Sequence, residues 1–457
     1  MRTISRGLNA LVERYLPSAF IFALILTLLT LLMGMTLGHQ SFPKMTQYWY
    51  SGFWSFLAFG MQMVLILVTG YALAKAPVVN RALDRLAAIP GTQRSALALT
   101  MTVSAVMGFI SWGLGFVGGT LVAIAIAKRL DAADFRLLIA GSYAAVIASQ
   151  PISLTLTAPL LVNTPGHSLE DEIGLIPVTQ TLFSPTMILC AILGFIGVVI
   201  AFMIMAPRPG EVVPFGAQGR TKGSDPTPTP TSSSPDDPKE EQTPSTTIAE
   251  RLDHSRILAY LIACGGLTAI VLYFLENGFN LELNIINFAF LIVGIALHGS
   301  PTRYAECITD GIGAASGIVL QFPFYAGIIG MMGGAGLIQT IGGWFASIAT
   351  EQTMPVLTYI SAMLLNIFVP SAGGQWQLQG PVMLEATAGM DISAAMIVNA
   401  VSVGDMTTNL LQPFFVLPAL GLSGLQLKDI WGFCMTAMFV LIVICGSIFA
   451  IAPLLGW

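Results

Sequence analysis

The sequence predicts an all-α polytopic membrane protein made of two inverted repeats, each with a re-entrant helical hairpin and a broken helix. Three observations support this fold class: the apolar composition, the placement of basic residues, and two glycine-interrupted apolar runs. Hydrophobic residues make up 55% of the 457 residues and charged residues only 9%, with a mean hydropathy of +0.78. A water-soluble core cannot bury this much apolar surface, so the surrounding solvent is largely lipid.

Apolar runs of about 20 residues are long enough to cross a bilayer as helices. Nine crossings are predicted, at 16–36, 52–74, 137–162, 185–206, 257–275, 281–298, 311–335, 395–418 and 430–454. Two longer runs, 95–127 and 355–388, are interrupted near the middle by ISWGLGFVGG at 110–119 and VPSAGGQWQLQGP at 369–381. These runs are predicted to be the two hairpins, in addition to the nine crossings.

Basic residues predict the orientation of these runs, because Lys and Arg collect in short cytoplasmic loops. Both ends of 95–127 are basic, so both should be cytoplasmic. A hairpin that enters and leaves from one face satisfies this, since an arm of about 13 to 15 residues passes the midplane without crossing. All of the 19 basic residues except Lys44 then fit a cytoplasmic amino terminus and an external carboxyl terminus.

Residues recur between the two halves at a nearly constant spacing. At an offset of 260 the matches are Ser111 with Ser371, Gly113 with Gly373, Asp131 with Asp391 and Ser142 with Ser402; at 259 they are Gly52 with Gly311, Gln62 with Gln321 and Pro159 with Pro418. The basic residues place 75–94 inside and its counterpart 336–354 outside, so the repeats are inverted. Inverted repeats allow alternating access, because exchanging the conformations of the halves changes the face to which the site opens.

These repeats define the predicted domains. The first repeat occupies 1–206 and the second 257–457, and a linker at 207–256 joins them. The linker contains DPTPTPTSSSPDDPKEEQTPSTT, whose Pro, Ser, Thr and acidic residues predict a disordered cytoplasmic tether. A regulatory or partner-docking role for the linker is the alternative.

The interrupted runs supply the predicted substrate site, because transporters hold solutes at broken helices near the midplane. The candidate substrate-binding residues are Ser111, Trp112, Gly113, Gly115, Ser371, Gly373, Gly374, Gln375, Trp376 and Gln379. No Lys or Arg is predicted at mid-membrane, so helix amino-terminal N–H groups would have to hold an anion. Such a site suits a small monoanion, with the two tryptophans either walling an apolar tail or packing between helices.

Asp405 is the only acidic residue predicted deep within a span. A carboxylate there costs about 2.5–3.5 kcal/mol and usually faces a cavity, an ion or a proton path. The candidate coupling residues are Asp405, Thr407, Thr408, Asn409 and Gln412, with Ser149, Gln150 and Ser153 in the first half. They would hold Na⁺ near Asp405 or let Asp405 carry a proton; the alternative is a carboxylate satisfied by neighbouring donors.

Apart from that Na⁺, neither a metal nor another cofactor is predicted, because the five cysteines and four histidines are dispersed. The predicted partners are a small carboxylate and membrane lipid, with no nucleic acid. An intramembrane acyl or glycosyl transferase would need a cluster of acids, bases or nucleophiles, which one buried Asp does not supply. The chain is therefore predicted not to be an enzyme.

Several stretches resemble the bacterial short-chain fatty acid transporter family, and the resemblance runs through nearly the whole chain. They are LPSAFIFALILTLLT, YWYSGFWSFLAFGMQM, QFPFYAGI, QPFFVLPALGLSGL, KDIWGFC and the pattern P-S-x-G-G-x-W-x-x-Q-G-P, matched by Pro370, Ser371, Gly373, Gly374, Trp376, Gln379, Gly380 and Pro381. The resemblance implies inner-membrane uptake of short monocarboxylates such as butyrate or acetoacetate. It also implies kinship with the ion transporter superfamily, whose members pair two hairpins in inverted repeats, often as dimers with an elevator motion; a homodimer is accordingly expected.

The predicted function is secondary active transport of small monocarboxylates coupled to H⁺ or Na⁺. Within transport, a Na⁺-coupled dicarboxylate carrier and a Na⁺/H⁺ antiporter remain as alternatives. The sequence does not determine the coupling ion, the preferred acid, the oligomeric state or the direction of transport.

Overall fold

The computed structural model describes residues 19–207, 210–216, 247–411 and 415–457, and the regular structure in these residues is entirely helical. In the first half the helices are α2 (Ala19–Thr36), α3 (Phe42–Phe53), α4 (Leu57–Lys75), α5 (Pro77–Leu86), α6 (Gln93–Ile110), α7 (Trp112–Ala127), α8 (Phe135–Ser149), η1 (Gln150–Ile152), α9 (Thr157–Leu161), α10 (Glu170–Ile173) and α11 (Pro185–Met205). Most of the predicted linker, and Gln412 of the predicted coupling set, lie outside the described residues.

In the second half the helices are α12 (Ile248–Asp253), α13 (Arg256–Asn277), α14 (Leu283–His298), α15 (Pro301–Ile312), η3 (Gly313–Ala315), α16 (Ser316–Gly334), α17 (Leu337–Ile348), α18 (Met354–Asn366), α19 (Ala372–Ala386), α20 (Ala394–Thr408), α21 (Leu417–Ser423), α22 (Leu427–Ile451) and η4 (Ala452–Leu455). Among the short helices that were not expected from the hydropathy of the sequence are α5 and α17, which lie in predicted loops, and α3 and α15. The last two share a feature. Both α3 and α15 begin at a Ser followed closely by Pro and carry charged residues. A search for long apolar runs therefore does not find them.

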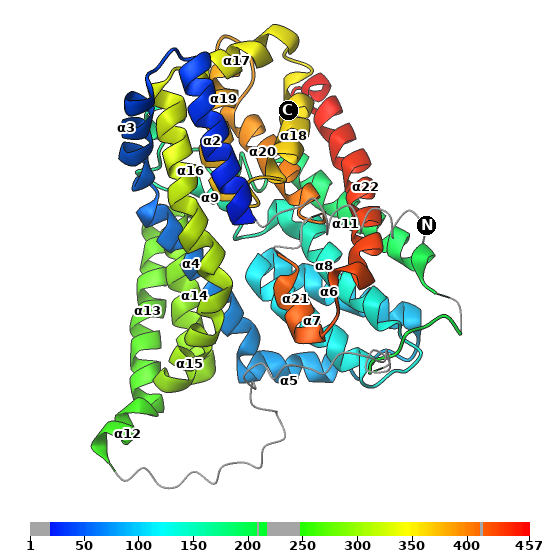
Figure 1. Ribbon diagram of the computed structural model, residues 1–457. Helices are drawn as coiled ribbons and strands as arrows, with labels where there is room; N and C mark the ends of the chain where they lie inside the picture. The colour runs from blue at the N-terminus through cyan, green and yellow to red at the C-terminus, as the bar shows by residue number, and fades with distance from the viewer. Residues whose placement is uncertain (1–18, 208–209, 217–246, 412–414) are drawn as a thin grey trace.

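The described helices form two bundles that lie side by side (Figure 1). We call α2–α4 and α13–α16 the frame bundle, in which α16 packs on α2, α3 and α4, while α14 packs on α13 and α4. We call α6–α9, α11 and α18–α22 the hairpin bundle, in which α8 packs on α6, α7 and α11. Helices α5 and α17 link the bundles and lie at opposite ends of the molecule (Figure 1).

Each interrupted run folds back on itself as two packed helices. In the first, α6 and α7 meet at the extended residue Ser111, and their backbones approach so closely that a Cβ on Gly115 would lie 2.6 Å from the Gly108 Cα. In the second, α18 and α19 are joined by hydrogen bonds from Gln375 Nε2 to the Ala362 carbonyl (2.9 Å) and from Gln379 Nε2 to Ser361 Oγ (2.8 Å). Neither run is a single straight helix.

One broken helix was predicted in each repeat, and one predicted crossing in each half is interrupted. The predicted span 137–162 is divided into α8, the 3₁₀ turn η1 and α9, and the predicted span 395–418 is divided between α20 and α21. Pro151 lies in η1, where a proline ring cannot continue the α-helical hydrogen bonding.

Six helical stretches are long and apolar enough to cross a membrane: Leu57–Lys75, Phe135–Leu161, Pro185–Met205, Arg251–Asn277, Ser316–Gly334 and Leu427–Leu455. Shorter apolar helices accompany them, among them α7, α14 and α18. On α13 the exposed side chains include Ile257, Leu261 and Leu275, as expected for a surface in contact with lipid. The chain is a multi-pass membrane protein, and nine crossings with two hairpins stay a prediction.

The start of the predicted linker contacts the hairpin bundle. The buried carboxylate of Asp134 accepts hydrogen bonds from the N–H groups of Leu137 (3.0 Å) and Val213 (3.0 Å) and pairs with Arg136. The Phe135 N–H also donates to the Val213 carbonyl (2.9 Å). Residues near 213 are thereby attached to the turn between α7 and α8.

Candidate functional site

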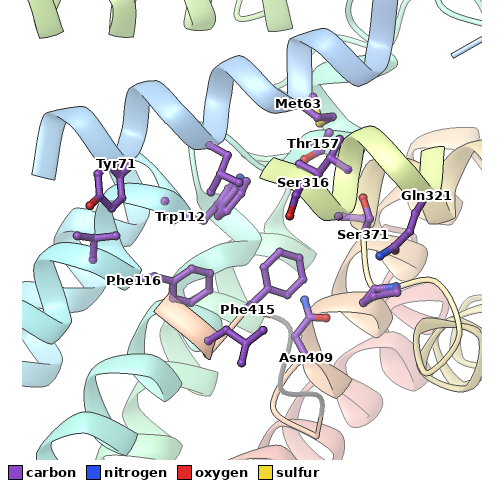
Figure 2. Close-up of a pocket in the computed structure, with 18 of the residues that line it drawn as sticks. Met63, Tyr71, Trp112, Phe116, Thr157, Ser316, Gln321, Ser371, Asn409 and Phe415 are labelled. Carbon is purple, nitrogen blue, oxygen red and sulfur yellow. The ribbon is translucent and has the colours of Figure 1, made fainter. Parts of the chain in front are cut away.

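A cavity of about 520 Å³ lies where the two bundles meet (Figure 2). The frame bundle contributes side chains of α4, η3 and α16, and the hairpin bundle contributes both hairpin tips and both helix breaks. The lining residues are Met63, Leu67, Tyr71, Trp112, Gly113, Phe116, Val117, Gln150, Thr157, Gly313, Ser316, Gly317, Ile318, Gln321, Phe322, Pro370, Ser371, Ala372, Asp405, Asn409, Phe415, Leu417, Gly421 and Leu422. The two interrupted runs, 260 residues apart in sequence, therefore reach one site.

The first hairpin tip is held by the segment that follows η1. The Trp112 N–H, at the start of α7, donates to Thr155 Oγ1 (3.1 Å). Ser153 Oγ donates to the Gly108 carbonyl at the end of α6 (2.7 Å). The next N–H groups of α7, on Gly113 and Leu114, have no intrahelical acceptor because they belong to the first turn, and Gly113 lines the cavity.

The second hairpin tip presents the start of α19 to the same cavity. The Gln375 N–H donates to the Ser371 carbonyl (2.6 Å), and Ser371 Oγ accepts from the Gly374 N–H (3.4 Å). The N–H groups of Ala372 and Gly373 precede these bonds and have no intrahelical acceptor. The amino-terminal end of α19 carries partial positive charge, so this tip favours an anionic group.

Asp405 is the only carboxylate among the described residues that line the cavity, and its side chain is 1% exposed. Its Oδ2 accepts a long hydrogen bond from Asn409 Nδ2 (3.4 Å), and its Oδ1 has no partner among the described residues. A buried carboxylate oxygen without a donor is costly. A proton or a cation at this position would remove that cost.

Two residues that the sequence analysis did not single out position the Asp405 region. Asn366, the last residue of α18, donates through Nδ2 to the Asp405 carbonyl (2.7 Å), Thr408 Oγ1 (2.9 Å) and Asn409 Oδ1 (2.9 Å). The Tyr143 hydroxyl of α8 donates to the Asn409 carbonyl (2.7 Å). Asn366 could have been found from the sequence, because it is an amide within an apolar run. Nothing in the sequence distinguishes Tyr143.

Of the predicted site residues, six line the cavity: Trp112, Gly113, Gln150, Ser371, Asp405 and Asn409. The Oε1 atom of Gln150 is buried without a partner among the described residues. Gln150 and Asp405 stand at the ends of α8 and α20, so both helix breaks contribute a polar side chain.

Most of the other predicted residues lie behind the lining and contact protein. Ser149 donates to the Val146 carbonyl (3.0 Å) and Thr407 to the Val403 carbonyl (2.7 Å). Thr408 Oγ1 donates to the Met363 carbonyl (3.2 Å). A Cβ on Gly373 would lie 2.5 Å from the Phe59 ring. Also away from the lining are Ser111, Gly115, Ser153, Gly374, Gln375, Trp376 and Gln379.

The frame bundle adds cavity residues that sequence reasoning about the hairpins missed. Tyr71 and Met63 of α4 and Ser316 of α16 point toward the cavity (Figure 2). Gln321 lies on the same helix and accepts a hydrogen bond from the Tyr325 hydroxyl (3.0 Å). Met63, Tyr71 and Ser316 come from ordinary apolar helices, so only the packing of the bundles reveals them, whereas Gln321 was already matched with Gln62 between the halves.

A helical, lipid-exposed chain that encloses a cavity between two bundles, at the breaks of several helices, is a membrane transport protein in its architecture. The sequence model of the short chain fatty acid transporter family matches residues 1–451. The chain belongs to this family, as the resemblance predicted. Members of the family are transporters, and the chain is accordingly a transport protein and not an enzyme.

Two relatives extend the match over almost the full length. A protein of Escherichia coli strain K12, provisionally named a short-chain fatty acid transporter, is 37% identical over 436 residues, covering 95% of this chain and 96% of the relative. A protein of Haemophilus influenzae with the same provisional name is 37% identical over 445 residues, with the same coverage.

Among solved structures, the chain is similar to the YdaH transporter of Alcanivorax borkumensis, whose crystal structure has an unusual topology. The TM-score is 0.59 and the sequence identity 15%, covering 96% of this chain and 99% of the other. At that identity the likeness concerns the fold.

Proposed function

We propose that the protein is a secondary active transporter that moves small monocarboxylates, short-chain fatty acids such as butyrate or acetoacetate, across the bacterial inner membrane. The observation that carries the proposal is the cavity shared by both hairpin tips, with Asp405 beside it. The names of the family and of the relatives support the substrate class.

The charges around the cavity favour a single negative charge on the substrate. No Lys or Arg is among the described lining residues, so an anion would be held by the amino-terminal N–H groups of α7 or α19 and by polar side chains such as Ser371. A second carboxylate on the substrate would find no fixed cation. This favours a monocarboxylate carrier over the dicarboxylate alternative.

Coupling follows from the same charges. An anion in this cavity lies near Asp405, and two negative charges in a low-dielectric site repel strongly. A proton on Asp405, or a Na⁺ bound beside it with oxygens such as that of Asn409, would remove the repulsion. We propose that one of these ions enters with the acid and drives its accumulation.

Alternating access is the proposed mechanism. Helices α16, α17, α19 and α20 start 259 or 260 residues after α4, α5, α7 and α8, and α5 and α17 lie at opposite ends of the molecule (Figure 1). These correspondences support two inverted repeats with re-entrant hairpins, a cytoplasmic amino terminus and a periplasmic carboxyl terminus. In this proposal the hairpin bundle moves against the frame bundle as an elevator, within a homodimer.

Uptake into proteoliposomes tests this function. Purified protein is reconstituted, and labelled C2 to C6 monocarboxylates are offered with a Na⁺ gradient or a pH gradient imposed separately. We expect butyrate to accumulate under one gradient and the accumulation to collapse when an ionophore dissipates it; protein-free liposomes are the control. Butyrate that accumulates under neither gradient and competes with no accumulated solute would contradict the proposal.

A further inference from the structure

The cavity has two chemically different ends. At one end Trp112, Phe116 and Phe415 form an aromatic cluster, with ring centroids 5.8 Å apart for Trp112 and Phe415 and 6.1 Å apart for each of the other two pairs. Figure 2 shows this cluster and Tyr71 on one side of the cavity, while Ser371, Gln321 and Asn409 lie on the other. The aromatic end is at the first hairpin tip and the polar end at the second.

One position at the start of the two tips contributes to this difference. The first tip reads Ser111-Trp112-Gly113 and the second Ser371-Ala372-Gly373. Trp112 therefore fills the position that Ala372 leaves small. At an offset of 259, Asp405 corresponds to Val146 in the first half. Of these two matching positions, only the one in the second half carries a carboxylate.

Backbone donors occur at both tips: the N–H groups of Gly113 and Leu114 at the first, and those of Ala372 and Gly373 at the second, have no intrahelical acceptor. The groups around these donors therefore distinguish the two tips. At the first tip the Trp112 N–H already donates to Thr155 Oγ1 (3.1 Å). A carboxylate there would also lie against aromatic faces, which carry partial negative charge. At the second tip the start of α19 and the Ser371 side chain border the cavity.

We propose that this asymmetry fixes the orientation of the bound acid: its carboxylate lies at the second hairpin tip, and its hydrocarbon tail lies against Trp112, Phe116 and Phe415. The three aromatic side chains then determine the length of the tail that is carried. Each methylene that they remove from water strengthens binding by about fourfold. The inference rests on the proposed function, because it assigns an orientation to the monocarboxylate proposed above.

Fluorescence quenching by brominated acids tests the orientation without measuring transport. Bromine quenches tryptophan on contact, so 4-bromobutyrate carries the quencher on its tail and 2-bromobutyrate carries it beside the carboxylate. The concentrations of the two acids are chosen so that each displaces the same fraction of labelled butyrate. At this equal occupancy we expect 4-bromobutyrate to quench the tryptophan fluorescence more strongly than 2-bromobutyrate does. The excess should disappear in Trp112→Phe and persist in Trp344→Phe, a matched change at an exposed residue of α17.

Equal quenching by the two acids, or stronger quenching by 2-bromobutyrate, would overturn the orientation while leaving monocarboxylate binding intact. A different result separates the two proposals: if labelled butyrate does not bind at all, the proposed function fails, and the orientation falls with it.

A separate transport measurement tests the role of the aromatic cluster in selecting tail length. Phe116→Leu enlarges the aromatic end, so the transport efficiency for hexanoate relative to butyrate should rise by about tenfold. Phe324→Leu is the control, because Phe324 packs on Phe53 in the frame bundle and is not among the cavity residues. An unchanged ratio in a Phe116→Leu protein that still carries butyrate would overturn the role of the cluster.

Discussion

Asp405 concentrates the chemistry of the cavity at one residue. One of its oxygens has a single long hydrogen bond from Asn409 and the other has no partner among the described residues. Its backbone, by contrast, is firmly held, since Asn366 donates to the Asp405 carbonyl at 2.7 Å. A carboxylate on a fixed backbone, with an unsatisfied oxygen beside a cavity, is suited to exchange a proton or a cation.

Removing the charge of Asp405 should separate coupling from binding. In Asp405→Asn we expect gradient-driven butyrate accumulation to fall on the order of tenfold or more, because the amide cannot take up a proton or neutralise Na⁺. Butyrate exchange across the membrane without a gradient should persist. The measurement compares accumulation and counterflow in the same proteoliposomes.

Asp391→Asn is the matched control, since Asp391 is an exposed carboxylate before the start of α20. It should accumulate butyrate as the unmodified protein does. Undiminished accumulation by Asp405→Asn would exclude a coupling role for this carboxylate.

At the scale of elements, glycine permits the first hairpin to close. Gly115 on α7 faces Gly108 on α6, and an added Cβ would lie 2.6 Å from the Gly108 Cα, 2.8 Å from its nitrogen and 2.9 Å from Val146 Cγ2. Two of these three atoms belong to backbone, which cannot move aside as a flexible side chain would. The hairpin therefore depends on glycine at this position.

Gly115→Ala should force α6 and α7 apart. We expect a loss of about 1–3 kcal/mol in stability from overpacking, seen as a lower thermal unfolding temperature of the purified protein. Butyrate uptake should fall as well, because the tip at Trp112 would be displaced from the cavity.

Gly343→Ala serves as the comparison for this change. Gly343 also lies within a helix, α17, but an added Cβ there would meet no atom within 4 Å. Since alanine favours helix more than glycine does, this variant should be as stable as the original or slightly more so. Equal unfolding temperatures for the two variants would show that the hairpin tolerates a wider spacing.

For the whole molecule, the proposal of inverted repeats predicts that corresponding residues lie on opposite faces of the membrane. Ala88 follows α5, and Ser347, 259 residues later, lies near the end of α17; both are exposed. In a background without the five native cysteines, Ser347→Cys should react with a membrane-impermeant maleimide in intact cells. Ala88→Cys should react only after the membrane is permeabilised.

Labelling of both cysteines from the same face would contradict the inversion. Because the reagent reports the side of the membrane directly, this result would stand even if the transported acid had been identified correctly. The fold and the substrate are thus tested separately.

The sequence by itself determined the membrane class, both interrupted runs and both broken helices, because these features depend on local composition. A run of apolar residues must lie in lipid or in a core, and proline at 151 cannot continue α-helical hydrogen bonding wherever the chain is placed. The helix breaks that bring Gln150 and Asp405 to the cavity could accordingly be predicted without knowledge of their neighbours.

Only the tertiary structure decided which side chains face the cavity. Gln375 and Trp376 lie in the interrupted run but contact protein behind the tip, whereas Tyr71 and Phe415 line the site without any distinguishing sequence pattern. The physical reason is that a side chain's direction depends on how its helix is rotated against the helices packed on it, whether these are close in sequence, as α18 is to Gln375, or in the other half of the chain. Local sequence determines where a helix breaks, and the packing of the two bundles determines which side chains lie opposite that break.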